Sequence, residues 1–278
     1  MSPSLTARLI APSLALSMLL SIGASSAEGT VDTSPAQKIL LLGNSILYAG
    51  NVPATLSNLS RRSGVTLDVS MYAQPGAKVS DIVNDDHAME LLRSGHFDAV
   101  VFHDQGGNSA CASEPVLSNE CVRIVGDHRT ITEAIRKGGA TPYLLGTYQK
   151  SMEASTRIEA AESRIARELD IVHIPVSAKW HEGMKDLPDS AWLAADGMHP
   201  GGALTALMAI EILVATTGRC PSQIAADSEA TQGVPVEQRE KKLYVANANR
   251  DAPGAKISAE EMRKLTVIAK PSCTAGGG

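Results

Sequence analysis

The feature that most constrains the fold is a regular alternation of short apolar runs with longer segments of helical period. Each run has the length of a β-strand, and the segments between the runs place apolar residues at the spacing of an amphipathic helix. Parallel neighbouring strands need long crossover connections, so this alternation favours an α/β fold with a parallel sheet covered on both faces. The runs are KILLLG (38–43), TLDVSMY (66–72), FDAVVFH (97–103), TPYLLGTY (141–148) and DIVHIPV (170–176).

Five segments between and after these runs are predicted to be helices. The last of them, GALTALMAIEILVATTG, ends on Gly218, a residue typical of a helix C-terminus. The first covers 53–62, with Asn51 or Val52 near its cap. The other predicted helices cover 79–93, about 119–137 and about 152–169.

The two ends of the chain differ in composition from this central part. Residues 1–27 combine one arginine, an apolar stretch and the small residues Ser25-Ser26-Ala27, which predicts a secretory signal peptide, with an uncleaved anchor helix as the alternative. We expect one domain at 28–218. Residues 219–278 are predicted to be an appendage packed on it, with a short helix that opens at a capping box, Ser258 to Glu261, and disordered last residues.

Charge and cysteine content narrow the class of protein. With 25 basic and 30 acidic side chains the net charge is −5, and no basic stripe is present, so we expect no nucleic-acid partner. The four cysteines lack CxxC spacing, which in a secreted chain favours disulfides over zinc. Of the three possible pairings we favour Cys111–Cys121, which brackets one loop, and Cys220–Cys273, which would fasten the C-terminal tail.

Polar groups follow several of the predicted strands. In an open parallel sheet, ligands bind beyond the carboxyl ends of the strands. Ser45 follows the first run, Gly76 the second, and the segment HDQGGNSAC the third, while LAADGMHPGG precedes the last helix. Four loops therefore offer polar groups to one edge of the sheet.

The DGMH segment has the spacing of a base and its orienting partner. Asp196 can accept a hydrogen bond from one imidazole nitrogen of His199, which leaves the other nitrogen to take a proton from Ser45. Pro200 favours an extended conformation at His199, and Gly197 provides the turn. Alone, an Asp and a His before a helix are also a common capping arrangement, and Gly-Asn-Ser is a common turn.

Taken together, four blocks resemble the SGNH, or GDSL-type, serine hydrolases. The resemblance spans roughly 38–218 and is strongest at the first and last blocks. It is closest to a bacterial branch whose first block reads Gly-Asn-Ser, and it implies a three-layer α/β/α sandwich with a five-stranded parallel sheet of flavodoxin-like topology. The blocks are ILLLGNSILYAGNVP, GAKVSD, FDAVVFHDQGGNS and DGMHPGGAL.

The resemblance also implies roles for individual residues. Ser45 would be the nucleophile, His199 the base and Asp196 its orienting partner. The oxyanion hole would combine the backbone N–H groups of Ser45 and Gly76 with a side-chain amide. The superfamily pattern Gly-x-Asn favours Asn108 for this amide, and the glutamine-rich segment of the similar branch makes Gln105 the alternative.

Other polar residues near these blocks have two interpretations each. His103 and Asp104 would line the pocket or form a satisfied polar pair at a strand end. Trp180 would be a pocket wall or part of a surface turn. Asn44 is a further candidate pocket residue and stands where an aspartate is more usual. WHEGM lacks the second histidine of a zinc motif, and no Walker or GxGxxG loop occurs, so we expect no metal and no cofactor.

The sequence therefore predicts a bacterial serine esterase, secreted to the periplasm or the extracellular space, with no membrane span after signal cleavage. Its expected partner is a small-molecule or glycan ester, such as an O-acetylated carbohydrate or another short-chain carboxylic ester. Two alternatives remain open at this stage: an O-acyltransferase acting on glycans, and a non-catalytic carbohydrate-binding protein on the same fold.

Overall fold

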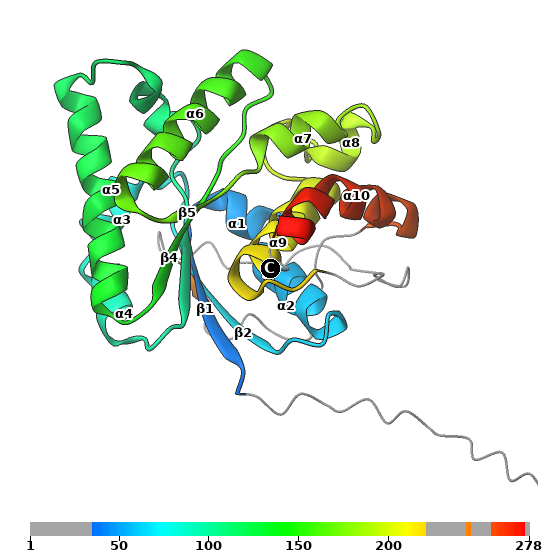
Figure 1. Ribbon diagram of the computed structural model, residues 1–278, viewed down its shortest axis with the longest axis horizontal. Coiled ribbons are helices and arrows are strands. Elements are labelled where there is room, and N and C mark those ends of the chain that lie inside the picture. Colours follow the sequence, from blue (N-terminus) through cyan, green and yellow to red (C-terminus); the bar gives the residue numbers. More distant parts are fainter. Residues whose placement is uncertain (1–34, 221–242, 246–256, 276–278) are drawn as a thin grey trace, which may run out of the picture. The chain divides into compact units, whose positions relative to one another are not determined.

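A six-stranded sheet lies at the centre of the protein (Figure 1). The computed structural model describes residues 35–220, 243–245 and 257–275. The strand order is β5-β4-β3-β1-β2-β6, with β1 to β5 parallel to their neighbours and β6 antiparallel to β2. The strands are β1 (Gln37–Gly43), β2 (Leu67–Ala73), β3 (Ala99–Phe102), β4 (Thr141–Leu145), β5 (Val172–Ile174) and β6 (Leu243–Val245).

The five parallel strands confirm the predicted α/β fold. Their order, 2-1-3-4-5, is that of flavodoxin-like sheets. The edge strand β6 was not foreseen, because it lies in 219–256, where the sequence shows little periodicity. It pairs with the residues Met71 to Ala73 of β2.

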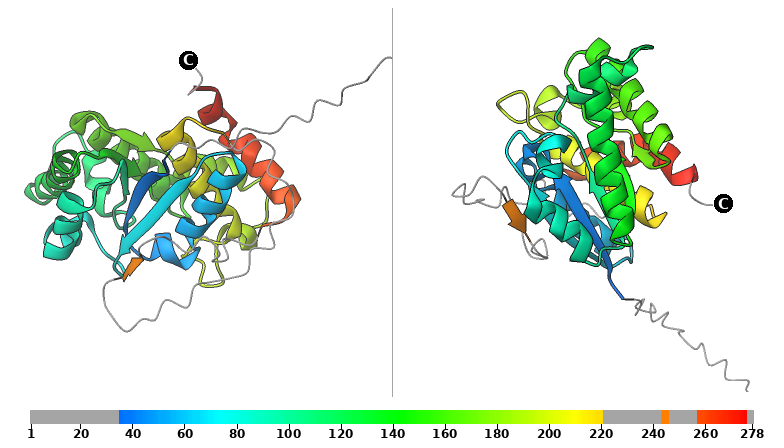
Figure 2. Two further views of the ribbon diagram at one scale, coloured as in Figure 1. Left: turned by 90° about the horizontal axis from the view of Figure 1, so that it is seen from below. Right: turned by 90° about the vertical axis from the view of Figure 1, so that its left-hand side faces the viewer.

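Helices cover both faces of the sheet, as Figures 1 and 2 show. The alternation of side chains along β1 divides the core in two: Ile39 and Leu41 pack with α2 and α9, while Leu40 and Leu42 pack with α3, α4 and α5. The described helices are α1 (Ser45–Ala49), α2 (Val52–Arg62), α3 (Val79–Val83), α4 (Asp86–Ser94), the 3₁₀ helix η1 (Asn108–Ser113), α5 (Asn119–Lys137), α6 (Met152–Leu169), α7 (Ser177–Gly183), α8 (Asp189–Trp192), α9 (Gly202–Thr217) and α10 (Ala259–Ala275).

Most helix predictions are confirmed, but the helix predicted at 79–93 is wrong, because it is divided into α3 and α4. The carboxylate of Asp85 caps α4 by accepting from the N–H groups of His87 and Ala88. The same side chain accepts hydrogen bonds from Tyr72 Oη and Gln74 Nε2, both at 2.6 Å. These bonds come from residues more than ten positions earlier, so helical periodicity alone does not reveal the break.

The cysteine predictions have different outcomes. A disulfide joins Cys111 to Cys121, as predicted, and ties η1 to the start of α5. Cys220 is disulfide-bonded as well, but the side chain of Cys273 lies outside the described residues, so the second pairing stays a prediction.

At the C-terminal end of the chain, α10 packs its apolar side against α9 and α7 through Met262, Leu265 and Ile268. The predicted signal peptide and most of the segment 219–256 lie outside the described residues. Among the helices that are described, none has both the length and the apolar character needed to cross a membrane.

Candidate active site

A cavity of about 400 Å³ opens at the carboxyl ends of the parallel strands. Its walls come from the loops after β1, β2, β3 and β4 and from the segment before α9, which is the edge that the sequence predicted to gather polar groups. Ser45, Gly76, Gln105 and His199 all line it.

Ser45 is the first residue of α1, directly after the turn that ends β1. The preceding residue, Asn44, caps this helix: its Oδ1 accepts from the N–H of Ile46 at 3.1 Å, and its Nδ2 donates to the carbonyl of Ala77 at 3.0 Å. The first N–H of a helix has no acceptor within the helix. Among the described residues this N–H of Ser45 makes no hydrogen bond, so it is available to a bound group.

His199, in the cavity wall, is in close polar contact with Asp196. The Nδ1 of His199 lies 2.6 Å from Oδ2 of Asp196, and Oδ1 accepts from the N–H groups of Met198 and His199, both at 2.9 Å. These bonds lower the pKa of Asp196 to about 2. Because an ionised carboxylate only accepts, Nδ1 carries a proton, and in the neutral ring Nε2 is the nitrogen that can act as a base.

The loop that carries this pair is held from several sides. Gly197 has φ of 68°, in the left-handed region that favours glycine, and the N–H of Ala194 donates to the carbonyl of His199 at 2.9 Å. Tyr148, which follows β4, donates its hydroxyl to the carbonyl of Met198 at 3.1 Å. The imidazole therefore sits on a tight turn that is tied to the end of the sheet.

The residues expected in the oxyanion hole differ in their placement. Gly76 lines the cavity with φ of 65°, and Gln105 lines it with an exposed side chain. Asn108 is not among the lining residues, and its Nδ2 donates to Oδ2 of Asp104 at 2.8 Å. The structure thus brings Ser45, Gly76 and Gln105 to one cavity and engages Asn108 elsewhere.

The other candidate pocket residues divide in the same way. Asn44 and Trp180 line the cavity, whereas His103 and Asp104 are buried beneath it, each about 1% exposed. Burial lowers the pKa of His103 to about 4, against the opposing effect of its bond to the carbonyl of Asp104.

Sequence reasoning missed several lining residues from one loop. Tyr148, Gln149 and Lys150 follow β4, and Tyr148 packs edge-on against Trp180 with ring centroids 5.2 Å apart. Their position after the fourth apolar run was the available signal, because every parallel strand ends at this same edge.

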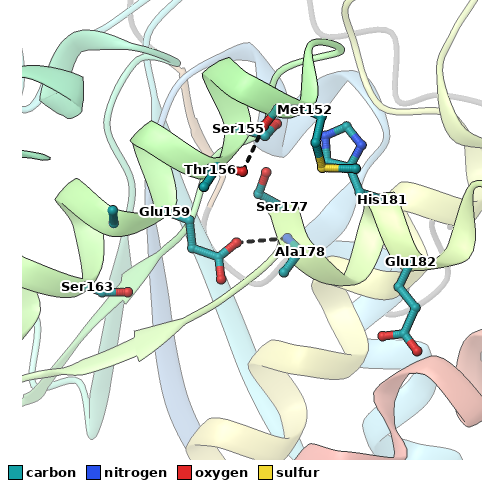
Figure 3. Close-up of a pocket in the computed structure, with 10 residues that line it drawn as sticks. Met152, Ser155, Thr156, Glu159, Ser163, Ser177, Ala178, His181 and Glu182 are labelled. Atoms are coloured by element: carbon teal, nitrogen blue, oxygen red, sulfur yellow. Dashed lines mark hydrogen bonds between the residues drawn. The ribbon is translucent and has the colours of Figure 1, made fainter.

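A second cavity, of about 540 Å³, lies between α6 and α7 (Figure 3). Glu159 reaches across it from α6 and accepts a hydrogen bond from the N–H of Ala178 at 2.8 Å. His181, on the opposite wall, lies with Nε2 3.2 Å from the carbonyl of Gln149, a residue of the first cavity. The walls of the two cavities are therefore in contact through His181 and Gln149.

One side chain of this second cavity, Ser163, takes part in a contact chain that resembles a catalytic triad. Its Oγ lies 3.1 Å from Nδ1 of His173, and Nε2 of His173 lies 3.4 Å from Oε2 of Glu162. Burial raises the pKa of Glu162, which also accepts from both donors of Thr147. Ser163 lies inside α6, where backbone N–H groups donate to carbonyls four residues earlier and leave no oxyanion donors. We assign these contacts a structural role.

The described residues contain no cluster of three or more histidine, cysteine, aspartate or glutamate side chains arranged to hold a metal ion. The first cavity offers a hydroxyl, an oriented imidazole and several N–H donors.

Comparison with protein-family models and with curated proteins gives no match. Solved structures do match. A DUF4886 family protein from Bacteroides uniformis superposes with a TM-score of 0.57 at 14% identity, over 86% of this chain and 96% of that one. A putative GDSL-like lipase from Parabacteroides merdae gives 0.50 at 16% identity, over 67% and 98%. The acetyl xylan esterase AlAXEase gives 0.50 at 15% identity, over 64% and 98%.

These similarities show the fold: the chain has the three-layer architecture of the SGNH hydrolases, as the sequence blocks indicated. At such low identity the fold does not carry the activity with it. The activity has to be argued from the cavity.

Proposed function

We propose that the protein is a serine esterase that hydrolyses short-chain carboxylic esters. The observation that carries the proposal is the 2.6 Å contact between His199 and Asp196 in the wall of a cavity that also holds Ser45 at a helix N-terminus. A hydroxyl, an imidazole that can act as a base and a carboxylate that fixes its tautomer are the parts that acyl transfer from an ester requires.

In the proposed reaction Nε2 of His199 takes the proton of Ser45 as Oγ attacks the acyl carbon. The ester carbonyl oxygen becomes an oxyanion, and the bond to the alcohol breaks as His199 returns the proton to the departing oxygen. Water then attacks the acyl-enzyme with His199 again as base, which releases the acid and restores Ser45. Asp196 stays ionised throughout and stabilises the imidazolium.

For the oxyanion we propose the N–H groups of Ser45 and Gly76 and the side-chain amide of Gln105. The lining of the cavity supports Gln105 over Asn108, whose amide already donates to Asp104. A donor of this kind contributes about 2.7–4 kcal/mol to transition-state stabilisation.

The proposed compartment is outside the cytoplasm. The N-terminal sequence and the disulfide between Cys111 and Cys121 support secretion, because such bonds persist in oxidising compartments. O-acetylated carbohydrates are therefore the first natural substrates to test, and one of the proteins with this fold is described as an acetyl xylan esterase.

The test is acid release from p-nitrophenyl acetate and from acetylated xylo-oligosaccharides by the mature protein. Hydrolysis that disappears in Ser45→Ala supports the proposal, and a folded wild type that releases no acid from any short-chain ester contradicts it. Product analysis with an added glycan acceptor covers the transferase alternative: acylated glycan formed faster than free acid would replace hydrolysis by acyl transfer.

A further inference from the structure

His103 lies directly against the turn that presents the nucleophile. It follows β3, and its N–H donates to the carbonyl of Leu42 at 3.1 Å, which continues the pairing of β3 with β1. The imidazole then covers Gly43 so closely that a Cβ on Gly43 would lie 2.2 Å from ring atoms Cδ2 and Nε2. Gly43 is therefore required by this ring, a close approach that the sequence alone does not reveal.

The two hydrogen-bond partners of His103 define its protonation state. Nδ1 lies 2.9 Å from the carbonyl oxygen of Asp104, which only accepts, so Nδ1 carries a proton. Nε2 lies 3.2 Å from the backbone nitrogen of Asn44, which only donates, so Nε2 carries none. The ring is thus neutral and accepts a hydrogen bond from the residue that precedes Ser45.

Asp104 makes the corresponding contacts to the other two loops. Its Oδ1 accepts from the N–H groups of Val79, at 3.0 Å, and Gln105, at 2.8 Å, and its Oδ2 accepts from Asn108. Val79 begins α3, three residues after Gly76, so Asp104 fixes one flank of the Gly76 loop. His128 also lies nearby, with Nε2 3.7 Å from Oδ2.

The Gly76 loop is also held from the nucleophile side. Asn44 donates from Nδ2 to the carbonyl of Ala77, so one asparagine contacts this loop with its side chain and His103 with its backbone. A continuous set of hydrogen bonds therefore joins the segments that carry Ser45, Gly76 and Gln105. Neither His103 nor Asp104 lines the cavity, so neither can touch a substrate.

We propose that His103 and Asp104 are positioning residues that hold the Ser45 turn, the Gly76 loop and the Gln105 segment in the geometry of one oxyanion hole. This inference rests on the proposed esterase function. An oxyanion hole works only when its donors are fixed before the charge develops, and a displacement of about 1 Å lowers rates by about 10²-fold. A buried pair that served stability alone would have no such effect on turnover.

The test compares two replacements of His103 with a matched control. Glutamine can present an acceptor where Nε2 stands, and leucine cannot. We expect His103→Leu and Asp104→Leu to lower kcat on p-nitrophenyl acetate by about 10²-fold with KM within about twofold, and His103→Gln to stay within about tenfold of the wild type. The control is His173→Gln, at the far edge of the sheet on β5, which should keep the wild-type kcat.

A folded His103→Leu or Asp104→Leu protein whose kcat stays within threefold of the wild type overturns the inference. If the leucine variants do not fold, the wild type still provides a test by ¹⁵N NMR of its histidines at pH 7. Resonances of a neutral ring protonated at Nδ1 support the proposal, and protonation of His103 at Nε2 overturns it. An inactive wild type would instead contradict the esterase function. The NMR measurement does not require activity, so the two outcomes can be told apart.

Discussion

Acid should destabilise this protein through His103 in a pH range that can be worked out from its surroundings. Burial lowers the pKa of His103 from its ordinary value of 6.5 to about 4 in the folded state. As the pH falls through 6.5, His103 becomes protonated in the unfolded chain, whereas in the folded protein it stays neutral down to about pH 4. The free energy of unfolding therefore decreases as the pH is lowered from 6.5 to about 4, and His103 has no further effect below pH 4.

The size of the effect follows from the same two values. At about 1.36 kcal/mol for each pH unit, the interval from 6.5 to about 4 corresponds to about 3 kcal/mol. Such a loss is a large fraction of the stability of a typical domain, which is about 5–15 kcal/mol. The physical cause is the burial of the imidazole, which disfavours its charged form.

The assay is urea denaturation of the wild type and His103→Gln from pH 7.5 to pH 4. Other groups, such as the buried carboxyl of Glu162, titrate in both proteins and cancel in the difference. We expect the advantage of the wild type to shrink by about 3 kcal/mol on acidification. A difference that stays constant over this range, or that grows in acid, refutes the assignment of a neutral His103.

Three further changes test the site. Asp196→Asn should leave the fold intact and lower kcat by about 10³–10⁴-fold, because the amide no longer selects the required tautomer; steady-state kinetics and circular dichroism check both parts. Gln105→Ala should lower kcat by about 10²–10³-fold and Asn108→Ala by much less, so equal losses would contradict the choice of Gln105. Gly43→Ala should destabilise the protein by about 1–3 kcal/mol in chemical denaturation, since its methyl group has to displace the ring of His103; an unchanged stability would show that the two are not in contact.

The parts of the fold that were predictable from the sequence are those set by local periodicity. Apolar runs indicated the five parallel strands, and 3.6-residue spacing indicated α2, α5, α6 and α9. The break between α3 and α4 was not predictable in this way, because Asp85 stops the helix through bonds to Tyr72 and Gln74, which are remote in sequence. Strand β6 was not predictable either, because it forms by pairing with β2, which is remote in sequence.

For the candidate site, residue spacing indicated the contact between Asp196 and His199, because both lie in one short turn. The roles of residues on separate loops were harder to predict. Asn108 fits the Gly-x-Asn pattern, yet its amide donates to Asp104, a bond that depends on how the segment after β3 folds back. Likewise, the hydrogen bond from Tyr148 to the carbonyl of Met198 joins residues fifty positions apart, so it could not be predicted without the arrangement of the sheet.

The central claim is that Ser45 is a nucleophile activated by His199. The most direct measurement is labelling of the mature, folded protein with a fluorophosphonate probe, followed by mass spectrometry of its peptides. The account predicts one modified serine, Ser45, with labelling absent in Ser45→Ala and much slower in His199→Ala. A folded wild type that stays unlabelled, or a label on another residue such as Ser163, would contradict it.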